Sequence, residues 1–382
     1  MDHAATTPVD PEVLQAMLPY FCEKCGNASS LHADGKEARE AIEDARRAVS
    51  SLIGAKEEEI FFTSGGTESD NLAILGTARK MKEGRVITSS IEHFAVLQPC
   101  KYLEEREFEV IRTGVDEYGV VDPSDIQNNI TKDTILITVM HANNEIGTIE
   151  DIKEIGKTAH DAKVPFHTDA VQSFGKIPID VKEKNIDMLS ISSHKLHGPK
   201  GVGAIFIRDG IDIEPLIFGG GHERGIRSGT ENVPGIVGLG KACEIAKKRM
   251  NTDGKRMSDM RDRLIKGLSE NIPRAFLNGH PTGRLPNNVN FRFFGVVGES
   301  LVKALDEYGI SVSAASACSS RDAETSHVLS AIGLGVEDAR SSVRLTIGRE
   351  NTREDIDYIL DVFPQVVGRL RLVSPSWNKG CW

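Results

Sequence analysis

The sequence has 382 residues, of which 39% are hydrophobic and 27% charged, and its formal net charge at pH 7 is -10. A chain of this length can bury a large core and is expected to fold into more than one domain. The acidic balance argues against nucleic acid or an anionic membrane surface as partner. We find no apolar run of about 18 residues and no secretory signal, so we expect a cytoplasmic protein, compatible with an enzyme for a small substrate or with a locally basic partner.

Short apolar runs alternate with amphipathic stretches over the first half of the chain. In chain order, strands are predicted at 59–64, 86–90, 108–113, 134–140, 164–170, 187–193 and 202–208, with helices at 67–82, 93–107 and 149–163 among them. This alternation predicts an α/β fold with a mostly parallel central sheet flanked by helices. Ligands of such sheets bind beyond the carboxyl ends of the strands, so motifs that directly follow a strand are the most informative.

A glycine-rich segment, 217–232, separates this pattern from a long helical stretch, and the character of the sequence changes near residue 252. Charged helices and a short strand then predict a second, smaller α+β domain. We expect a large domain of residues 13–251 and a small domain formed by residues 1–12 with 252–382.

The six cysteines are too sparse for a disulfide scaffold, so we expect free thiols. Cys22 and Cys25 form a CxxC pair, but no second pair exists, and two thiols at a helix end are favoured over zinc. Cys318 differs from the others because it lies among alanines and serines in 311–329, without a large apolar neighbour to pack against it. Because its small side chains provide little packing, we expect the segment around Cys318 to be able to move.

Lys195 follows an apolar strand in the segment SSHKLHGPKG (192–201). A lysine there is usually a solvated surface charge, but a desolvated lysine at a strand end can form a Schiff base. A Schiff-base cofactor such as pyridoxal phosphate (PLP) also needs a phosphate cradle, an anion for its ring nitrogen and a partner for its phenolic oxygen.

A phosphate cradle is predicted in FFTSGGTESDNLAIL (61–75), where a strand runs through glycines into a helix that begins near Thr67. Glycine lets the backbone approach a phosphate, and a helix N-terminus favours an anion. The segment matches neither the dinucleotide nor the P-loop pattern. An ordinary capped helix start is the alternative.

Three polar residues could complete such a site. Asp169 ends an apolar strand, where a carboxylate needs a cationic partner such as a protonated ring nitrogen. Gln172 could reach the phenolic oxygen, and His93 could stack on a planar ring and move protons. A metal site at His167 and Asp169 is disfavoured.

Nine segments together resemble the NifS/IscS group of cysteine desulfurases, which are PLP enzymes of the class-V aminotransferase family. They occur in the family's order and extend over nearly the whole chain: HAATTPVDP, TSGGTESDNLAI, SSIEHFAVL, HANNEIGT, HTDAVQSFGKIPIDV, SSHKLHGPKGVGA, GGGHERGIRSGTENV, SACSS and SSVRLTIGR. The resemblance implies PLP fold type I, the aspartate-aminotransferase fold.

The resemblance also implies roles for individual residues. Lys195 would hold PLP and act as acid and base, His93 would stack on the ring, and Cys318 would accept the sulfur of L-cysteine as a persulfide. Arg344 would grip the substrate α-carboxylate, with Asn144 beside it. The implied cofactor-binding residues are Gly66, Thr67, His93, Asn144, Asp169, Gln172, Ser192, His194, Lys195 and Thr230. Thr230 would reach the cofactor of the other subunit of a homodimer.

The long segment after Cys318 resembles the NifS/IscS type, which hands sulfur to an iron–sulfur scaffold protein of the IscU type. In that transfer Cys318 would ligate a cluster at most transiently, and no other metal ligand is implied. Selenocysteine lyase, or another PLP-dependent lyase of the same fold, is the alternative activity. An alternative outside the enzymes is a non-catalytic homodimer that serves as a structural partner. The candidate catalytic and binding residues argue against it: Lys195, Asp169, His93 and Arg344.

Overall fold

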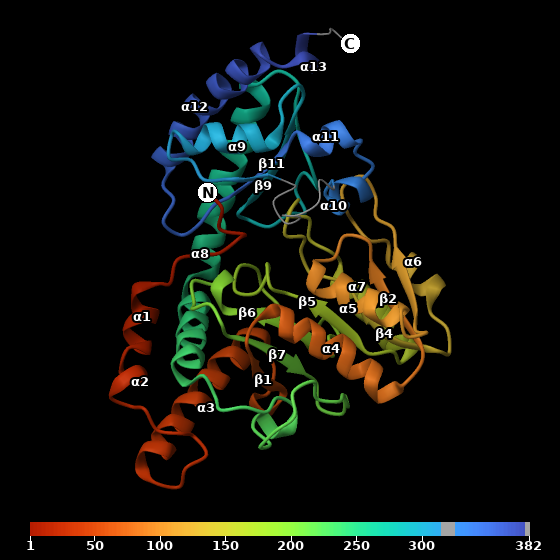
Figure 1. The fold of residues 1–382 in the computed structure, drawn as a ribbon, viewed down its shortest axis with the longest axis vertical. Coiled ribbons are helices and arrows are strands. Elements are labelled where there is room, and N and C mark those ends of the chain that lie inside the picture. Colours follow the sequence, from red (N-terminus) through yellow and green to blue (C-terminus); the bar gives the residue numbers. More distant parts are fainter. Residues whose placement is uncertain (315–324, 379–382) are drawn as a thin grey trace.

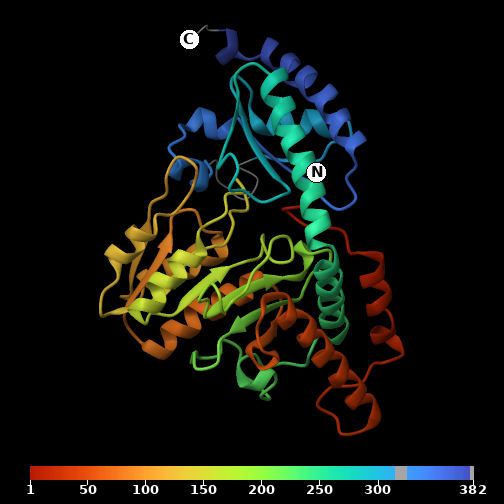
Figure 2. The same ribbon diagram turned by 180° about the vertical axis from the view of Figure 1, so that it is seen from behind.

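The computed structural model describes residues 1–314 and 325–378. Its lower part in Figure 1 contains a seven-stranded sheet, and its upper part a four-stranded one. Helix α8 (Val233–Asn271) runs from one part to the other, which Figure 2 shows from behind.

The large sheet is mostly parallel, as predicted. Its strands are β1 (Ile60–Thr63), β2 (Arg85–Ser89), β3 (Glu109–Thr113), β4 (Thr134–Thr138), β5 (Phe166–Asp169), β6 (Met188–Ser192) and β7 (Gly203–Ile207). They lie in the order β1-β7-β6-β5-β4-β2-β3, and only β7 runs antiparallel to its neighbours. The carboxyl ends of β1, β2, β4, β5 and β6 therefore meet at one edge of the sheet.

Helices cover both faces of this sheet. They are α1 (Pro11–Met17), α2 (Pro19–Cys22), α3 (Ala33–Ile53), α4 (Gly66–Met81), α5 (Phe94–Glu104), α6 (Pro123–Asn129) and α7 (Ile152–Ala162), together with the first half of α8. Consecutive strand residues point to opposite faces: Phe61 packs with α4 and α5, whereas Phe62 packs in the core that includes α3, α7 and α8. The expected layered α/β architecture is confirmed.

The smaller sheet is antiparallel, and it belongs to the part of the chain that also contains the C-terminal helices. Its strands lie in the order β10 (Ser313–Ala314), β11 (Ser342–Thr346), β9 (Asn288–Phe293) and β8 (Ala275–Leu277). The helices of this part are α9 (Gly298–Asp306), α10 (His327–Ala331), α11 (Val336–Arg340), α12 (Arg353–Leu372) and α13 (Pro375–Asn378). Phe291, Phe293 and Phe363 are fully buried in its core.

One core extends from Val13 to Ala246 and another from Met257 to Val367. The expected boundary near residue 252 lies inside α8. The helix continues through the weak helix formers Asn251, Thr252, Asp253 and Gly254, which stronger helix formers flank on both sides. The division into 13–251 and 1–12 with 252–382 stays a prediction. Over residues 1–314 and 325–378, the structure contains no helix with the length and apolarity that membrane crossing requires.

Candidate active site

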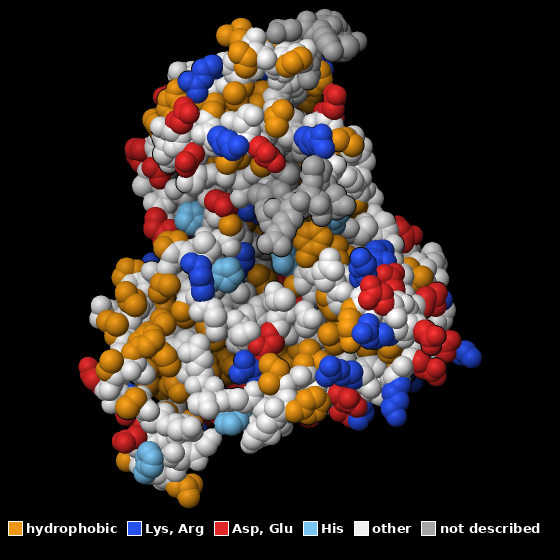
Figure 3. All heavy atoms as spheres, viewed as in Figure 1, with side chains coloured by type: hydrophobic (Ala, Val, Ile, Leu, Met, Phe, Trp, Pro, Cys, Tyr) orange, Lys and Arg blue, Asp and Glu red, His pale blue; other side chains and the backbone are white. Residues whose placement is uncertain are grey.

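A cavity of about 650 Å³ lies at the carboxyl ends of the parallel strands and extends to β10 and β11. It brings together these predicted residues: Gly66, Thr67, His93, Asn144, Asp169, Gln172, Ser192, His194, Lys195 and Arg344. Figure 3 shows this side of the molecule, with histidine and lysine or arginine side chains along the groove between the two parts. Thr230 does not belong to the described lining, and Cys318 lies outside the described residues.

Lys195 ends the 3-10 turn η2 (Ser193–Lys195), directly after β6. Its Nζ donates to the carbonyl oxygens of Ala4 at 2.5 Å and Ala5 at 2.7 Å. The N-terminal segment therefore contributes directly to the site. The sequence could not predict these two contacts, because the acceptors are backbone carbonyl oxygens, which every residue has.

Asp169 and Gln172 both line the cavity. Asp169 Oδ1 accepts a hydrogen bond from Val171 N at 2.8 Å, and Gln172 Nε2 donates to Ala4 O at 3.0 Å. Burial raises the pKa of Asp169, while His93 and Lys195 act to lower it. Because a buried carboxylate is costly without a cationic partner, a protonated ring nitrogen fits this position.

His93 caps the N-terminus of α5, where its Nδ1 accepts from Ala95 N at 3.1 Å. Burial lowers the pKa of His93, and Asp169 opposes that shift. Burial and the nearby lysines lower the pKa of His194 to about 4. Both imidazoles are therefore neutral near pH 7, a state in which a ring nitrogen can accept a proton.

The cradle at the start of α4 is closely fitted around Gly66. A Cβ added at Gly66 would lie 2.7 Å from Val171 Cγ2 and 3.6 Å from Ser192 Cβ. Thr67 is exposed at the next position, and α4 directs its free N-terminal N–H groups here. This arrangement fits a phosphate at a helix N-terminus, so these residues together match the groups that PLP requires.

We predict that Gly66→Ala weakens binding of PLP about tenfold, because the added methyl group would displace Val171 at the cradle. Titration of the apoprotein with PLP, followed by absorbance, measures this. A matched control is Gly114→Ala, where no atom lies within 4 Å of the added Cβ. The double variant G66A/V171A should recover affinity, and the steric explanation is wrong if it does not.

Arg344 projects from β11 into the same cavity. Its NH1 donates to Asn144 O at 2.9 Å and its NH2 to Asp2 Oδ1 at 2.9 Å. The guanidinium is thus anchored by the loop after β4 and by the N-terminal segment. A planar guanidinium held in this way is suited to binding a carboxylate.

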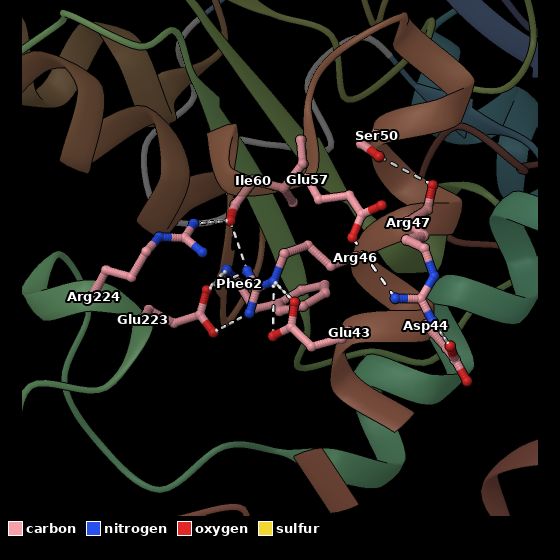
Figure 4. A network of polar contacts seen from close by, with 10 residues as sticks. All are labelled: Glu43, Asp44, Arg46, Arg47, Ser50, Glu57, Ile60, Phe62, Glu223 and Arg224. Atoms are coloured by element: carbon pink, nitrogen blue, oxygen red, sulfur yellow. Dashed lines mark hydrogen bonds and ion pairs between the residues drawn. The ribbon is translucent and has the colours of Figure 1, made fainter. Parts of the chain in front are cut away.

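Thr230 is exposed on the glycine-rich loop before α8. A buried ion pair holds this loop against β1: Arg46 of α3 binds Glu223 through NH1–Oε2 and NH2–Oε1, both at 2.9 Å (Figure 4). The two side chains are only 4% and 5% exposed. Glu223 also accepts from Phe62 N at 2.8 Å, and Arg224 donates to Ile60 O at 2.6 Å.

A second ion pair joins the same loop to the start of α4, where the phosphate cradle is predicted. Arg227 Nε donates to Glu68 Oε1 at 2.8 Å, and Glu68 Oε2 accepts from Ser64 N at 2.8 Å. These contacts fix the loop that carries Thr230 both to β1 and to the start of α4. Because the partners lie 159 or more positions apart in sequence, sequence reasoning did not pair them.

We predict that Glu223→Ala lowers the free energy of unfolding by about 3 kcal/mol, because it leaves Arg46 buried without its main counterion. Urea denaturation measures the change. Asp44→Ala is the control, since Asp44 pairs with Arg47 at an exposed position, and it should cost less than about 0.5 kcal/mol. An equal loss in both variants would show that the Arg46–Glu223 pair does not anchor the fold.

The remaining cysteines and histidines form no metal site in the described part of the chain, where no group of three possible ligands occurs. Cys22, the last residue of α2, and Cys25, three residues after it, are exposed thiols, whereas Cys100 and Cys243 are buried. His167 forms hydrogen bonds with Thr138 Oγ1 at 2.8 Å and Ser190 Oγ at 2.9 Å. Its ring is thus part of the packed sheet.

The comparisons with known proteins agree with this geometry. Residues 1–359 match the model of the family described as aminotransferase class-V. The cysteine desulfurase IscS of Methanosarcina thermophila is 54% identical, over 99% of this chain and 94% of the relative. A solved NifS-like protein aligns with a TM-score of 0.91 at 39% identity, over 96% of this chain and 98% of that one.

A second solved structure, described as SspA in complex with cysteine, aligns with a TM-score of 0.81 at 38% identity, over 91% of this chain and 97% of that one. The matches extend over the segments that build the cavity as well as the two sheets. The chain belongs to the class-V aminotransferase family and, within it, to the NifS/IscS group of cysteine desulfurases.

Proposed function

We propose that the protein converts L-cysteine to L-alanine and retains the sulfur as a persulfide on Cys318, from which it is donated for iron–sulfur cluster assembly. The observation that supports this most strongly is the convergence of Lys195, Asp169, His93 and Arg344 on one cavity. In the balanced reaction, L-cysteine and the Cys318 thiol become L-alanine and the Cys318 persulfide. The sulfur is oxidised as the S–S bond forms, and the substrate Cβ is reduced as its bond to sulfur breaks.

The residues that would hold PLP are those around the cavity, with Gly66, Thr67, Ser192 and His194 at its phosphate. When bound, PLP supplies an electron sink for the substrate α-carbon. Asp169 would keep a proton on the ring nitrogen, and Gln172 would bind the phenolic oxygen.

The proton transfers and the binding of substrate would fall to this chain's own side chains. Arg344 binds the α-carboxylate and so directs the substrate Cα toward Lys195. The Lys195 amine takes the α-proton and returns one, and neutral His93 accepts a proton beside it. Cys318, as its thiolate, attacks the substrate sulfur.

We infer a homodimer in which Thr230 serves the cofactor site of the second copy. Thr230 is exposed and lies away from the described lining of its own chain's cavity, so it is available to another subunit. An IscU-type scaffold protein is the proposed sulfur acceptor, and the proposed location is the cytoplasm. Sedimentation should give a dimer, and a stable monomer with full activity would contradict the role of Thr230.

Incubation of the PLP-loaded protein with L-cysteine tests the activity directly. We expect L-alanine in solution and one added sulfur on the peptide that contains Cys318, detected by mass spectrometry. Formation of pyruvate, ammonia and sulfide without added sulfur on Cys318 would favour β-elimination by a lyase mechanism instead. Absence of alanine would refute the proposed function.

A further inference from the structure

The segment Asp2–Ala5 is attached to the strand that carries Arg344. Thr346 N donates to Met1 O at 2.8 Å, and Ala4 N donates to Thr346 Oγ1 at 2.9 Å. Asp2 also forms a parallel bridge with Thr346. The backbone of this segment is therefore fixed relative to β11, which places the Asp2 side chain beside Arg344.

The guanidinium of Arg344 has three hydrogen-bond partners of different kinds. Its NH2 donates to Asp2 Oδ1 at 2.9 Å and to Ser313 Oγ at 3.3 Å, while its NH1 donates to Asn144 O at 2.9 Å. Its Nε is buried and has no partner among the described residues. Of the five N–H bonds of an arginine, these contacts use three and leave the Nε–H and one N–H on NH1 without a partner among the described residues.

Asp2 is the charged partner in this set. Asn144, Ser313 and Arg344 line the cavity, whereas Asp2 is not part of the described lining. The side chains of Arg344 and Asp2 are 9% and 27% exposed. A guanidinium this buried is costly without a counterion, and a charge-assisted hydrogen bond to a carboxylate also fixes the orientation of its plane.

We propose that Asp2 is a positioning residue for the substrate carboxylate. It holds the Arg344 guanidinium in place at the wall of the cavity, so that the guanidinium presents an N–H donor to the carboxylate of the incoming amino acid. The inference rests on the proposed function, in which Arg344 binds that carboxylate. Asp2 itself does not touch the substrate.

Asp2→Ala in the PLP-loaded enzyme is the principal test. We expect KM for L-cysteine to rise about tenfold while kcat changes less than about twofold, because the loss concerns binding of the carboxylate. The dissociation constant of L-alanine should rise by a similar factor, whereas that of ethylamine, which lacks the carboxylate, should not change. Asp2→Glu should restore part of the affinity for L-alanine.

A double-mutant cycle with Arg344→Gln separates positioning from a general structural role. If Asp2 acts through Arg344, Asp2→Ala has no further effect on L-alanine binding in the R344Q background. Equal weakening of ethylamine and L-alanine, or full additivity in the cycle, would overturn the proposal. Glu350→Gln is the matched control, since Glu350 lies beside His197 at 3.5 Å and is 56% exposed, and it should leave both dissociation constants unchanged.

Thermal unfolding of each variant identifies a folding defect. If Asp2→Ala is unstable, Asp2→Asn replaces it, because asparagine keeps an acceptor oxygen and loses only the charge; its L-alanine affinity should then fall between those of the wild type and R344Q. An Asp2→Asn affinity equal to that of the wild type would overturn the role of the charge. Failure of the wild type to convert L-cysteine would refute the proposed function, whereas the comparison of L-alanine with ethylamine would still test Asp2.

Discussion

Replacing Lys195 with alanine is expected to lower turnover of L-cysteine by at least about four orders of magnitude, because the variant loses the amine that anchors PLP and transfers the α-proton. Among the described residues that line the cavity, Lys200 is a second lysine, but Lys195 is the one whose Nζ donates to the carbonyl oxygens of Ala4 and Ala5. Steady-state formation of L-alanine measures the loss, and the absorbance of the protein should show that PLP is no longer covalently attached.

Lys153→Ala is the control for a lysine change, since Lys153 forms an exposed ion pair with Glu183 and should leave turnover within about twofold of the wild type. The K195A protein should still bind PLP noncovalently, because the cradle at Gly66 and Thr67 and the carboxylate of Asp169 are intact. Turnover above about one per cent of the wild type would contradict the assignment of Lys195.

Local pattern predicted the fold well, because most strands of the large sheet contain a short apolar run bounded by polar residues. It also predicted much of the cavity for a physical reason. Parallel strands bring their carboxyl ends to one edge, so residues directly after a strand, such as Asp169 after β5 and Lys195 after β6, converge even though they are far apart in sequence.

Contacts made by backbone groups or by distant partners could not be predicted in this way. The carbonyls of Ala4 and Ala5 have no side-chain signature, and Asp2 is an ordinary acidic residue until the chain places it beside Arg344. The pair of Arg46 and Glu223 joins residues 177 positions apart, and neither residue lies in a pattern that indicates burial. Tertiary packing alone brings such groups together.

With a thiol reductant present to release the persulfide sulfur as sulfide, Cys318→Ser is expected to lower the rate of sulfide release from L-cysteine at least about a hundredfold. PLP binding should be unchanged, because the substitution removes only the thiol that forms the persulfide. Cys318 lies outside the described residues, whereas the described cavity already contains the groups that bind the cofactor and the carboxylate. Loss of sulfur transfer should therefore be separable from loss of cofactor. Sulfide assays and the PLP absorbance of the same preparation measure the two.

Two further thiols act as controls for this substitution. Cys22→Ser changes an exposed thiol at the end of α2, and Cys25→Ser its neighbour in the CxxC pair; both variants should retain the wild-type rate. Cys100 and Cys243 are unsuited to transfer, because burial raises the pKa of each thiol, that of Cys100 to about 12, so little thiolate forms near neutral pH. If C318S released sulfide at the wild-type rate, the sulfur would leave without passing through Cys318, and a lyase mechanism on the same cofactor site would replace the persulfide mechanism.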